Sequence, residues 1–176
     1  MPTLTADRLI QLLTDYTRQT GASVDLLLVG ALALQAYGFH DRYTQDIDAE
    51  LVGSLEPLHA FFLAQQIPAG LTENFSRWSI VAMPPGYRDR STDLIRTERL
   101  RVRLLAPVDF VIAKLLRGTD LYLDDAIFVT TRFQITTDQI RAAADSALAA
   151  SPQDTALFLF RKTVEIFCRS LSSPST

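Results

Sequence analysis

The sequence predicts an α/β (α+β) fold, in which a mixed sheet flanked by helices is followed by a C-terminal helical part. Three observations predict it. Helical and strand-like apolar patterns alternate in the first part of the chain, an apolar run breaks at Gly30 into helix-forming residues, and the last third shows helical periodicity alone. We expect a single domain over residues 1–176, with a core at about 22–118 and helices at about 119–171.

The first elements follow from residue spacing. Residues 5–21 have the pattern of an amphipathic helix, with Thr5 in place to cap its start and Gly21 to end it. The next segment, "SVDLLLVG", is short and almost wholly apolar, which is typical of a buried central strand. It ends at Gly30 and "ALALQAYGF" follows, so we expect a strand, a glycine turn and a helix in succession.

Residues 46–51 alternate polar and apolar side chains, which is the period of a half-buried strand. One predicted face carries Asp46, Asp48 and Glu50, and the other carries Ile47, Ala49 and Leu51. The remaining patterns predict a helix capped by Ser54, strands near 76–84, 91–96 and 99–105, a helix from Pro107 to Gly118, and later helices capped by Thr137 and Ser151.

Composition narrows the class of protein. A hydrophobic share of 48% against 21% charged residues is typical of a globular chain, and the net charge of -3 argues against a nucleic-acid binder that uses its whole surface. The single cysteine, Cys168, excludes an internal disulfide. We find neither a secretory signal pattern nor an apolar run of the ~18 residues that a membrane span needs. We therefore expect a cytoplasmic protein with no membrane partner.

The acidic face of residues 46–51 suggests a metal site. Residues two apart on a strand lie roughly 6.5–7 Å apart, so Asp46 and Asp48 would repel each other unless a cation lay between them. Mg²⁺ commonly binds one or two carboxylates together with substrate phosphates. The alternative is the solvated face of an edge strand, on which acids discourage aggregation.

Neighbouring residues fit a phosphate ligand. Backbone N–H groups at Gly30 can approach a phosphate without obstruction by a side chain, and Arg42 can pair with one. Thr44 can hydrogen-bond an aspartate or cap the turn. The alternatives are an ordinary strand–helix turn at Gly30 and a surface salt bridge between Arg42 and Asp46.

One lysine and three alternating arginines each allow two interpretations. Lys114 either faces phosphates or pairs with an acid while its stem covers a helix. The alternating residues Arg99, Arg101 and Arg103 either meet RNA, a nucleotide or an acidic partner, or lie on a solvated sheet face. In the second case they are balanced by Glu98, Asp93 and Asp89.

The segment "LLVGALALQAYGFHDRYTQDIDAEL" resembles the signature of the nucleotidyltransferase fold shared with DNA polymerase beta: strand, glycine turn, helix, loop, Asp-apolar-Asp. Its "R-x-T-x-D-I-D" ending is similar to small bacterial members near the AbiEii-type toxins. The later "RLRVRLLAPVDFVIAKLLRG", with "LDD" after it, also resembles those relatives, so the resemblance spans roughly residues 24–130.

The resemblance implies a nucleotide site with defined roles. Asp46 and Asp48 would be the catalytic and metal-binding residues, holding Mg²⁺ (or Mn²⁺) with an NTP as substrate. The nucleotide-binding residues would be Gly30, Ala31, Arg42, Thr44 and Lys114. Two departures from the family pattern stand out: Ala31 replaces a glycine or serine, and the predicted strand near 76–84 offers no third carboxylate. The other candidate acids for that role are Asp93, Glu98 and Glu50, and none is assigned to it.

Three functions follow. The first is Mg²⁺-dependent transfer of an NMP from an NTP to a hydroxyl of a protein, an RNA such as tRNA, or a small molecule, in a toxin–antitoxin or defence system with a cognate toxin or antitoxin as partner. The second is a catalytically degenerate module that keeps the fold and binds a nucleotide or a partner. The third is a structural or dimerisation domain whose C-terminal helices bury an apolar face.

Overall fold

The computed structural model describes residues 3–172. The chain divides into two compact units, each treated separately below. The sheet unit comprises the residues up to Phe75 together with Ser91–Leu105, and the helical unit comprises Ser76–Arg90 together with the residues from Ala106 onward. The helix predicted to begin at Pro107 therefore groups with the C-terminal helices rather than with the sheet.

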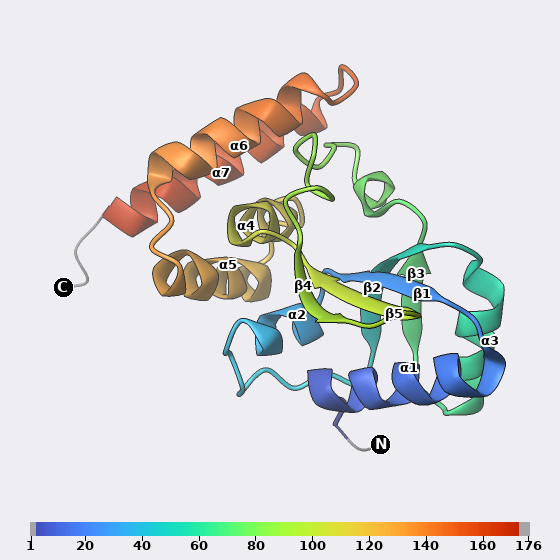
Figure 1. The fold of residues 1–176 in the computed structure, drawn as a ribbon. Coiled ribbons are helices and arrows are strands. Elements are labelled where there is room, and N and C mark those ends of the chain that lie inside the picture. The colour runs from blue at the N-terminus through green and yellow to red at the C-terminus, as the bar shows by residue number, and fades with distance from the viewer. Residues whose placement is uncertain (1–2, 173–176) are drawn as a thin grey trace. The chain divides into compact units, whose positions relative to one another are not determined.

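The sheet unit contains a five-stranded mixed sheet in the order β3-β2-β1-β5-β4 (Figure 1). The central strand β1 pairs with β2 in antiparallel and with β5 in parallel orientation, β3 pairs with β2 in parallel, and β4 pairs with β5 in antiparallel orientation. The mixed sheet predicted from sequence is thus confirmed. Its strands are β1 (Val24–Leu28), β2 (Ile47–Val52), β3 (Ala69–Thr72), β4 (Thr92–Arg96) and β5 (Leu100–Leu104).

One strand prediction was wrong and one strand was missed. Residues 76–84 form no strand; a 3-10 helix at Phe75–Trp78 is followed by bends. Backbone N–H groups in this segment donate hydrogen bonds to side chains and not to a neighbouring strand. Met83 N, for example, donates to Ser76 Oγ at 2.9 Å. The missed strand, β3, has four residues including a glycine, and its alternation is too short to recognise. Because β3 covers the outer edge of β2, the alternative that β2 is an edge strand is wrong.

The helices of the sheet unit are α1 (Ala6–Thr20), α2 (Ala31–Ala36) and α3 (Leu55–Ala64). The predicted caps of α1 are confirmed, since the Thr5 hydroxyl accepts from Arg8 N at 3.1 Å and Gly21 is left-handed with φ 69°. Helices α1 and α3 pack against each other, and the rings of Tyr16 and Phe61 lie 4.9 Å apart. Helix α2 connects β1 to the loop that leads into β2.

The helical unit contains α4 (Pro107–Leu115), α5 (Asp120–Arg132), α6 (Thr137–Ala149) and α7 (Ala156–Ser172). Thr136, rather than the predicted Thr137, caps α6 in a reciprocal capping box with Gln139. Ser151 caps no helix, because its hydroxyl donates to Ala147 O at 2.7 Å and accepts from Ala82 N at 2.8 Å. Within residues 3–172, no helix is both long and apolar enough to span a bilayer.

A buried ion pair joins α4 to α5. The Lys114 ammonium lies 2.9 Å from Asp125 Oδ2, and the side chains are 7% and 1% exposed. The same ammonium lies over the rings of Phe110 and Tyr122, at 5.0 and 4.9 Å from their centroids. Each charge therefore has a partner inside the unit, which satisfies the requirement for burying charged groups.

Removing one member of this pair is expected to be costly. We expect Asp125→Ala to lower the free energy of unfolding by about 3–5 kcal/mol, because it leaves a buried ammonium without its carboxylate. The double variant Lys114→Met/Asp125→Leu should regain most of that loss. Urea unfolding followed by circular dichroism measures both, and equal stability of the single variant and the unmodified protein would contradict the role assigned to the pair.

Candidate functional site

Two sequence motifs, the glycine turn and the acidic strand, meet at Gly30 and Asp48. Strand β1 pairs with the start of β2, and beyond the last paired residue Val29 N donates to Asp48 O at 3.1 Å. A Cβ atom placed on residue 30 would lie 2.6 Å from Asp48 Oδ2 and 2.7 Å from Asp48 Cβ. No side chain fits at residue 30 without a shift of backbone, so glycine is required where the two segments meet.

Asp46 lies directly before β2 and is exposed. The Thr44 hydroxyl donates a hydrogen bond to its carboxylate, and Asp46 N lies 3.4 Å from the same hydroxyl oxygen. Ile47, between the two aspartates, is fully buried in the core. Asp46 lies at a bend outside the strand, whereas Asp48 lies within the strand and is half-buried.

The loop that carries Asp46 is held by Gln35 of α2. The Gln35 amide donates to Arg42 O at 2.7 Å and to Leu4 O at 3.3 Å, while its carbonyl accepts from Ala6 N at 3.3 Å. Leu4 N in turn donates to Thr44 O at 2.9 Å. Gln35 was not predicted as a site residue; its signal in the sequence is a polar amide in an otherwise apolar helix.

Glu50 shares a predicted face with the aspartates but has a structural role. Its side chain is 1% exposed, and its carboxylate accepts from Phe75 N at 2.8 Å. The expectation of a solvated acidic face is therefore wrong for Glu50. Among the residues that the structure describes, no three His, Cys, Asp or Glu side chains form a group that could hold a metal ion. The site thus offers two carboxylates.

Strand β5 brings arginines to the same face of the sheet. Leu27 of β1 pairs with Glu50 on one side and with Arg103 on the other, so these three residues share a face. Arg103 is 5% exposed, and its Nε lies 2.8 Å from Asp25 Oδ1. An acid thus balances Arg103, but the expectation of a solvated face is wrong for this buried residue, and Asp25 was not among the acids expected.

The neighbouring arginine, Arg101, donates to Asp93 Oδ1 at 2.6 Å. This hydrogen bond is the main cause that lowers the pKa of Asp93 below its ordinary value. Arg96 lies 3.5 Å from the other oxygen of the same carboxylate. Arg99, the third alternating arginine, instead donates to Gly21 O.

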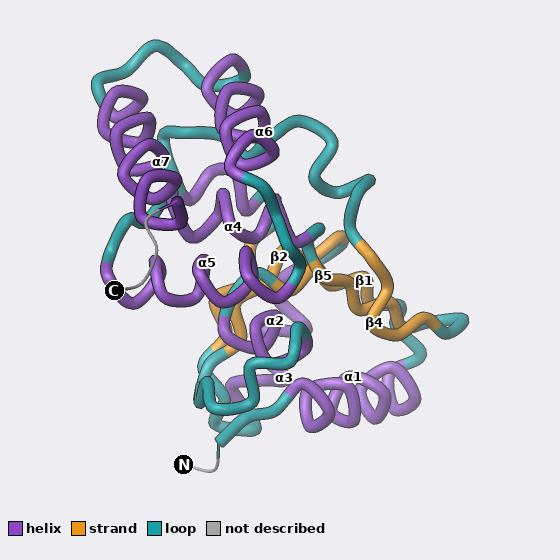
Figure 2. The backbone as a smooth tube through the Cα atoms, turned by 90° about the vertical axis from the view of Figure 1, so that its left-hand side faces the viewer, coloured by secondary structure: helices purple, strands orange, loops and turns teal. Residues whose placement is uncertain are grey.

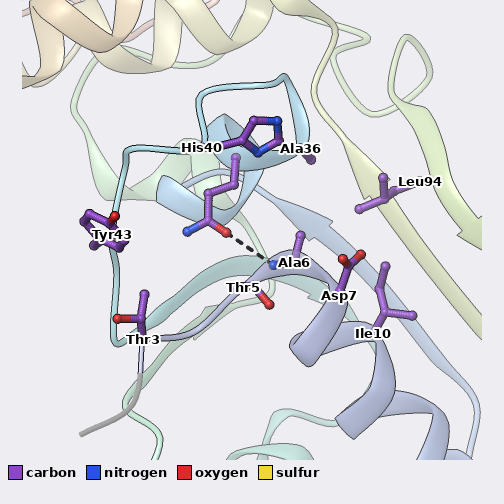
Figure 3. Close-up of a pocket in the computed structure, with 10 residues that line it drawn as sticks. Thr3, Thr5, Ala6, Asp7, Ile10, Ala36, His40, Tyr43 and Leu94 are labelled. Carbon is purple, nitrogen blue, oxygen red and sulfur yellow. Dashed lines mark hydrogen bonds between the residues drawn. The ribbon is translucent and has the colours of Figure 1, made fainter.

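A cavity of about 450 Å³ lies beside the motif loop (Figure 3). It is lined by the start of α1, by Gln35 and Ala36 of α2, by His40 and Tyr43 of the loop, and by Leu94 of β4. Tyr43 precedes Asp46 by three residues, so their Cα atoms lie within about 10 Å of each other. No lysine or arginine of the described chain is among the lining residues, so the cavity lacks the cations that bind a triphosphate.

The structure gathers most of the predicted site residues in the sheet unit. Gly30 caps α2, Ala31 is its first residue, and Arg42 and Thr44 lie in the loop before Asp46. Lys114 lies in the helical unit, where its ammonium is bound to Asp125. The assignment of Lys114 to nucleotide phosphates stays a prediction.

Comparison with known proteins gives one family match and one structural match. A family model described as "Nucleotidyltransferase of unknown function (DUF6036)" matches residues 4–157. No curated protein matches this chain. Among solved structures, the chain is similar to an antigenic nucleotidyltransferase-like protein from Paracoccidioides brasiliensis, with 14% identity, a TM-score of 0.48, and coverage of 90% of this chain and 100% of that one.

The contact between Gly30 and Asp48 gives a direct test. We expect Gly30→Ala to lower the free energy of unfolding by about 1–3 kcal/mol, because the added methyl meets the Asp48 side chain. In an Asp48→Gly background the same change should cost much less. Chemical unfolding of the four proteins closes a double-mutant cycle, and an equal cost in both backgrounds would rule out the clash.

Proposed function

This chain belongs to the DUF6036 family of nucleotidyltransferases of unknown function, and we propose that it binds a metal–NTP complex over Asp46 and Asp48 and transfers an NMP unit to a hydroxyl acceptor. The family match covers residues 4–157 and includes both aspartates, the glycine turn and Lys114. The transfer step and the identity of the acceptor are the parts that go beyond the family.

The observation that carries the proposal is the contact of Asp48 with Gly30. It brings the half-buried Asp48 carboxylate against the backbone of Gly30, which has no side chain. Asp46 stands two residues earlier, and the Thr44 hydroxyl orients its carboxylate. A metal held by both carboxylates would therefore lie beside backbone that a phosphate can approach closely.

The donor set fits Mg²⁺ or Mn²⁺. Both ions prefer oxygen ligands, and Mg²⁺ commonly retains several waters and is completed by substrate phosphates, so two carboxylates are enough to hold it. When bound, the ion would neutralise phosphate charge and polarise the phosphorus centre that the acceptor hydroxyl attacks. Gly30 and Ala31 would contact the triphosphate through their backbone, and Arg42 would pair with one of its oxygens.

The cavity beside the motif loop supports a place for the acceptor. It is close to Asp46 along the chain, and the groups around it include the hydroxyls of Thr3, Thr5 and Tyr43 (Figure 3). Such groups suit a neutral, hydroxyl-bearing molecule or side chain better than a triphosphate. The proposed acceptors remain a protein, an RNA such as tRNA, or a small molecule, with a toxin–antitoxin or defence system as the setting.

A second candidate function is nucleotide binding without transfer. It is favoured by the hydrogen bond between the Glu50 carboxylate and Phe75 N–H, which occupies one candidate for a third carboxylate. Members with activity use a third carboxylate on a later strand, according to the resemblance described above. With two carboxylates, the site would retain the metal and nucleotide but lose the group that receives the proton of the acceptor.

Substitution of either aspartate tests the transfer reaction. We expect Asp46→Asn and Asp48→Asn each to reduce label transfer from [α-³²P]NTP by at least about a hundredfold, because each removes a charged metal ligand. Asp41→Asn, in the same loop, serves as the matched control and should retain activity. Undiminished transfer by both site variants would refute the assignment.

Thermal melting separates binding from transfer. A nucleotide that binds the folded state raises the melting temperature, so we expect Mg²⁺ with at least one NTP to produce a shift that Asp48→Asn abolishes. A shift without pyrophosphate release would support the second candidate function. The absence of a shift with all four NTPs would contradict both.

A further inference from the structure

We propose that the outer groove between α6 and α7 is a self-association surface that binds a second copy of this chain through a two-fold axis. The two helices lie side by side (Figures 1 and 2). Two cavities, of about 510 and about 300 Å³, follow one another along their outer side. Three residues, Asp145, Leu148 and Arg161, line both, so the cavities form one continuous groove.

The floor of the groove is apolar and its wall carries an exposed aromatic ring. Ala144, Leu148 and Val164 are buried beneath it. Phe158, on the wall at the start of α7, is 71% exposed. A hollow floored by a small residue and a projecting phenyl ring on the same hairpin are complementary shapes, as knobs and holes are between packed helices.

Among the described residues, five charged ones line the groove, and three of them are satisfied within the chain: Asp154 accepts a hydrogen bond from a backbone N–H, and the other two form an ion pair. Arg141 of α6 binds Glu165 of α7 through two hydrogen bonds, at 3.1 and 3.3 Å. Asp145 and Arg161 are both exposed, and neither makes an ion pair with any residue of the described chain. An acid on one helix and a base on the other thus border the apolar floor without charged partners.

This arrangement is self-complementary. A two-fold axis perpendicular to the groove and midway between Asp145 and Arg161 places each of these residues over the opposite charge of the second copy. The same operation carries Phe158 of one copy toward the α6 side of the other groove, where Ala144 leaves room. An arbitrary helical partner would need to supply both charges in the correct order, whereas a second copy supplies them by symmetry.

Charge reversal tests the surface. Sedimentation velocity of the full chain, from low micromolar to several hundred micromolar protein, should show a reversible dimer. We expect Arg161→Asp to weaken dimerisation by about tenfold, because it creates two repulsive contacts per dimer. Lys162→Asp, the neighbouring exposed residue off the groove, is the matched control for net charge and should leave the dimer unchanged.

A rescue experiment separates contact from general charge effects. The double variant Asp145→Arg/Arg161→Asp restores both pairings and should return the dissociation constant to within about threefold of the original. Phe158→Ala, which removes an exposed ring without disturbing the fold, should also weaken the dimer. A chain that stays monomeric at the highest concentration, or a dimer that Arg161→Asp and Phe158→Ala both leave intact, would overturn the proposal.

Discussion

The close approach of Gly30 to Asp48 is the constraint on which the candidate site depends. The end of β1 and the start of β2 meet so tightly that the Asp48 side chain occupies the space of a residue-30 Cβ. Antiparallel pairing of β1 with β2 establishes this contact, and β3 on the other side of β2 restricts the strand further. The result is a carboxylate whose position is determined by the sheet itself and not by a flexible loop.

Charge on the polar face of the sheet is distributed by strand. On this face, β2 carries Glu50, β1 carries Asp25 and the apolar Leu27, and β5 carries Arg101 and Arg103. Asp25 binds Arg103 at 2.8 Å, while Glu50 binds a backbone amide, so the buried charges of this face are satisfied locally. Asp46 and Asp48 differ from Glu50 in position, because they lie where the chain enters the sheet, and they are exposed and half-buried, respectively.

In the helical unit, ion pairs between side chains likewise satisfy the buried charges. Among its described residues, buried Lys114 pairs with buried Asp125 between α4 and α5, and buried Asp109 pairs with Arg90 at 2.9 Å. In the groove between α6 and α7, by contrast, Asp145 and Arg161 border an apolar floor, and neither has an ion-pair partner among residues 3–172. Buried charges require compensation within the chain, whereas exposed charges are available to define which surface can associate with it.

The sequence by itself determined the mixed sheet, the strand–glycine–helix unit and the strand that follows Asp46. These features follow from the local spacing of apolar residues and from the absence of a side chain at Gly30, both of which can be read from the sequence. Tertiary structure decided the rest: β3 as an edge strand, the amide that Glu50 binds, the partner of Arg103, and the internal pairing of Lys114. Each of these depends on residues far apart in the sequence, such as Glu50 and Phe75 or Asp25 and Arg103, whose meeting no local pattern encodes.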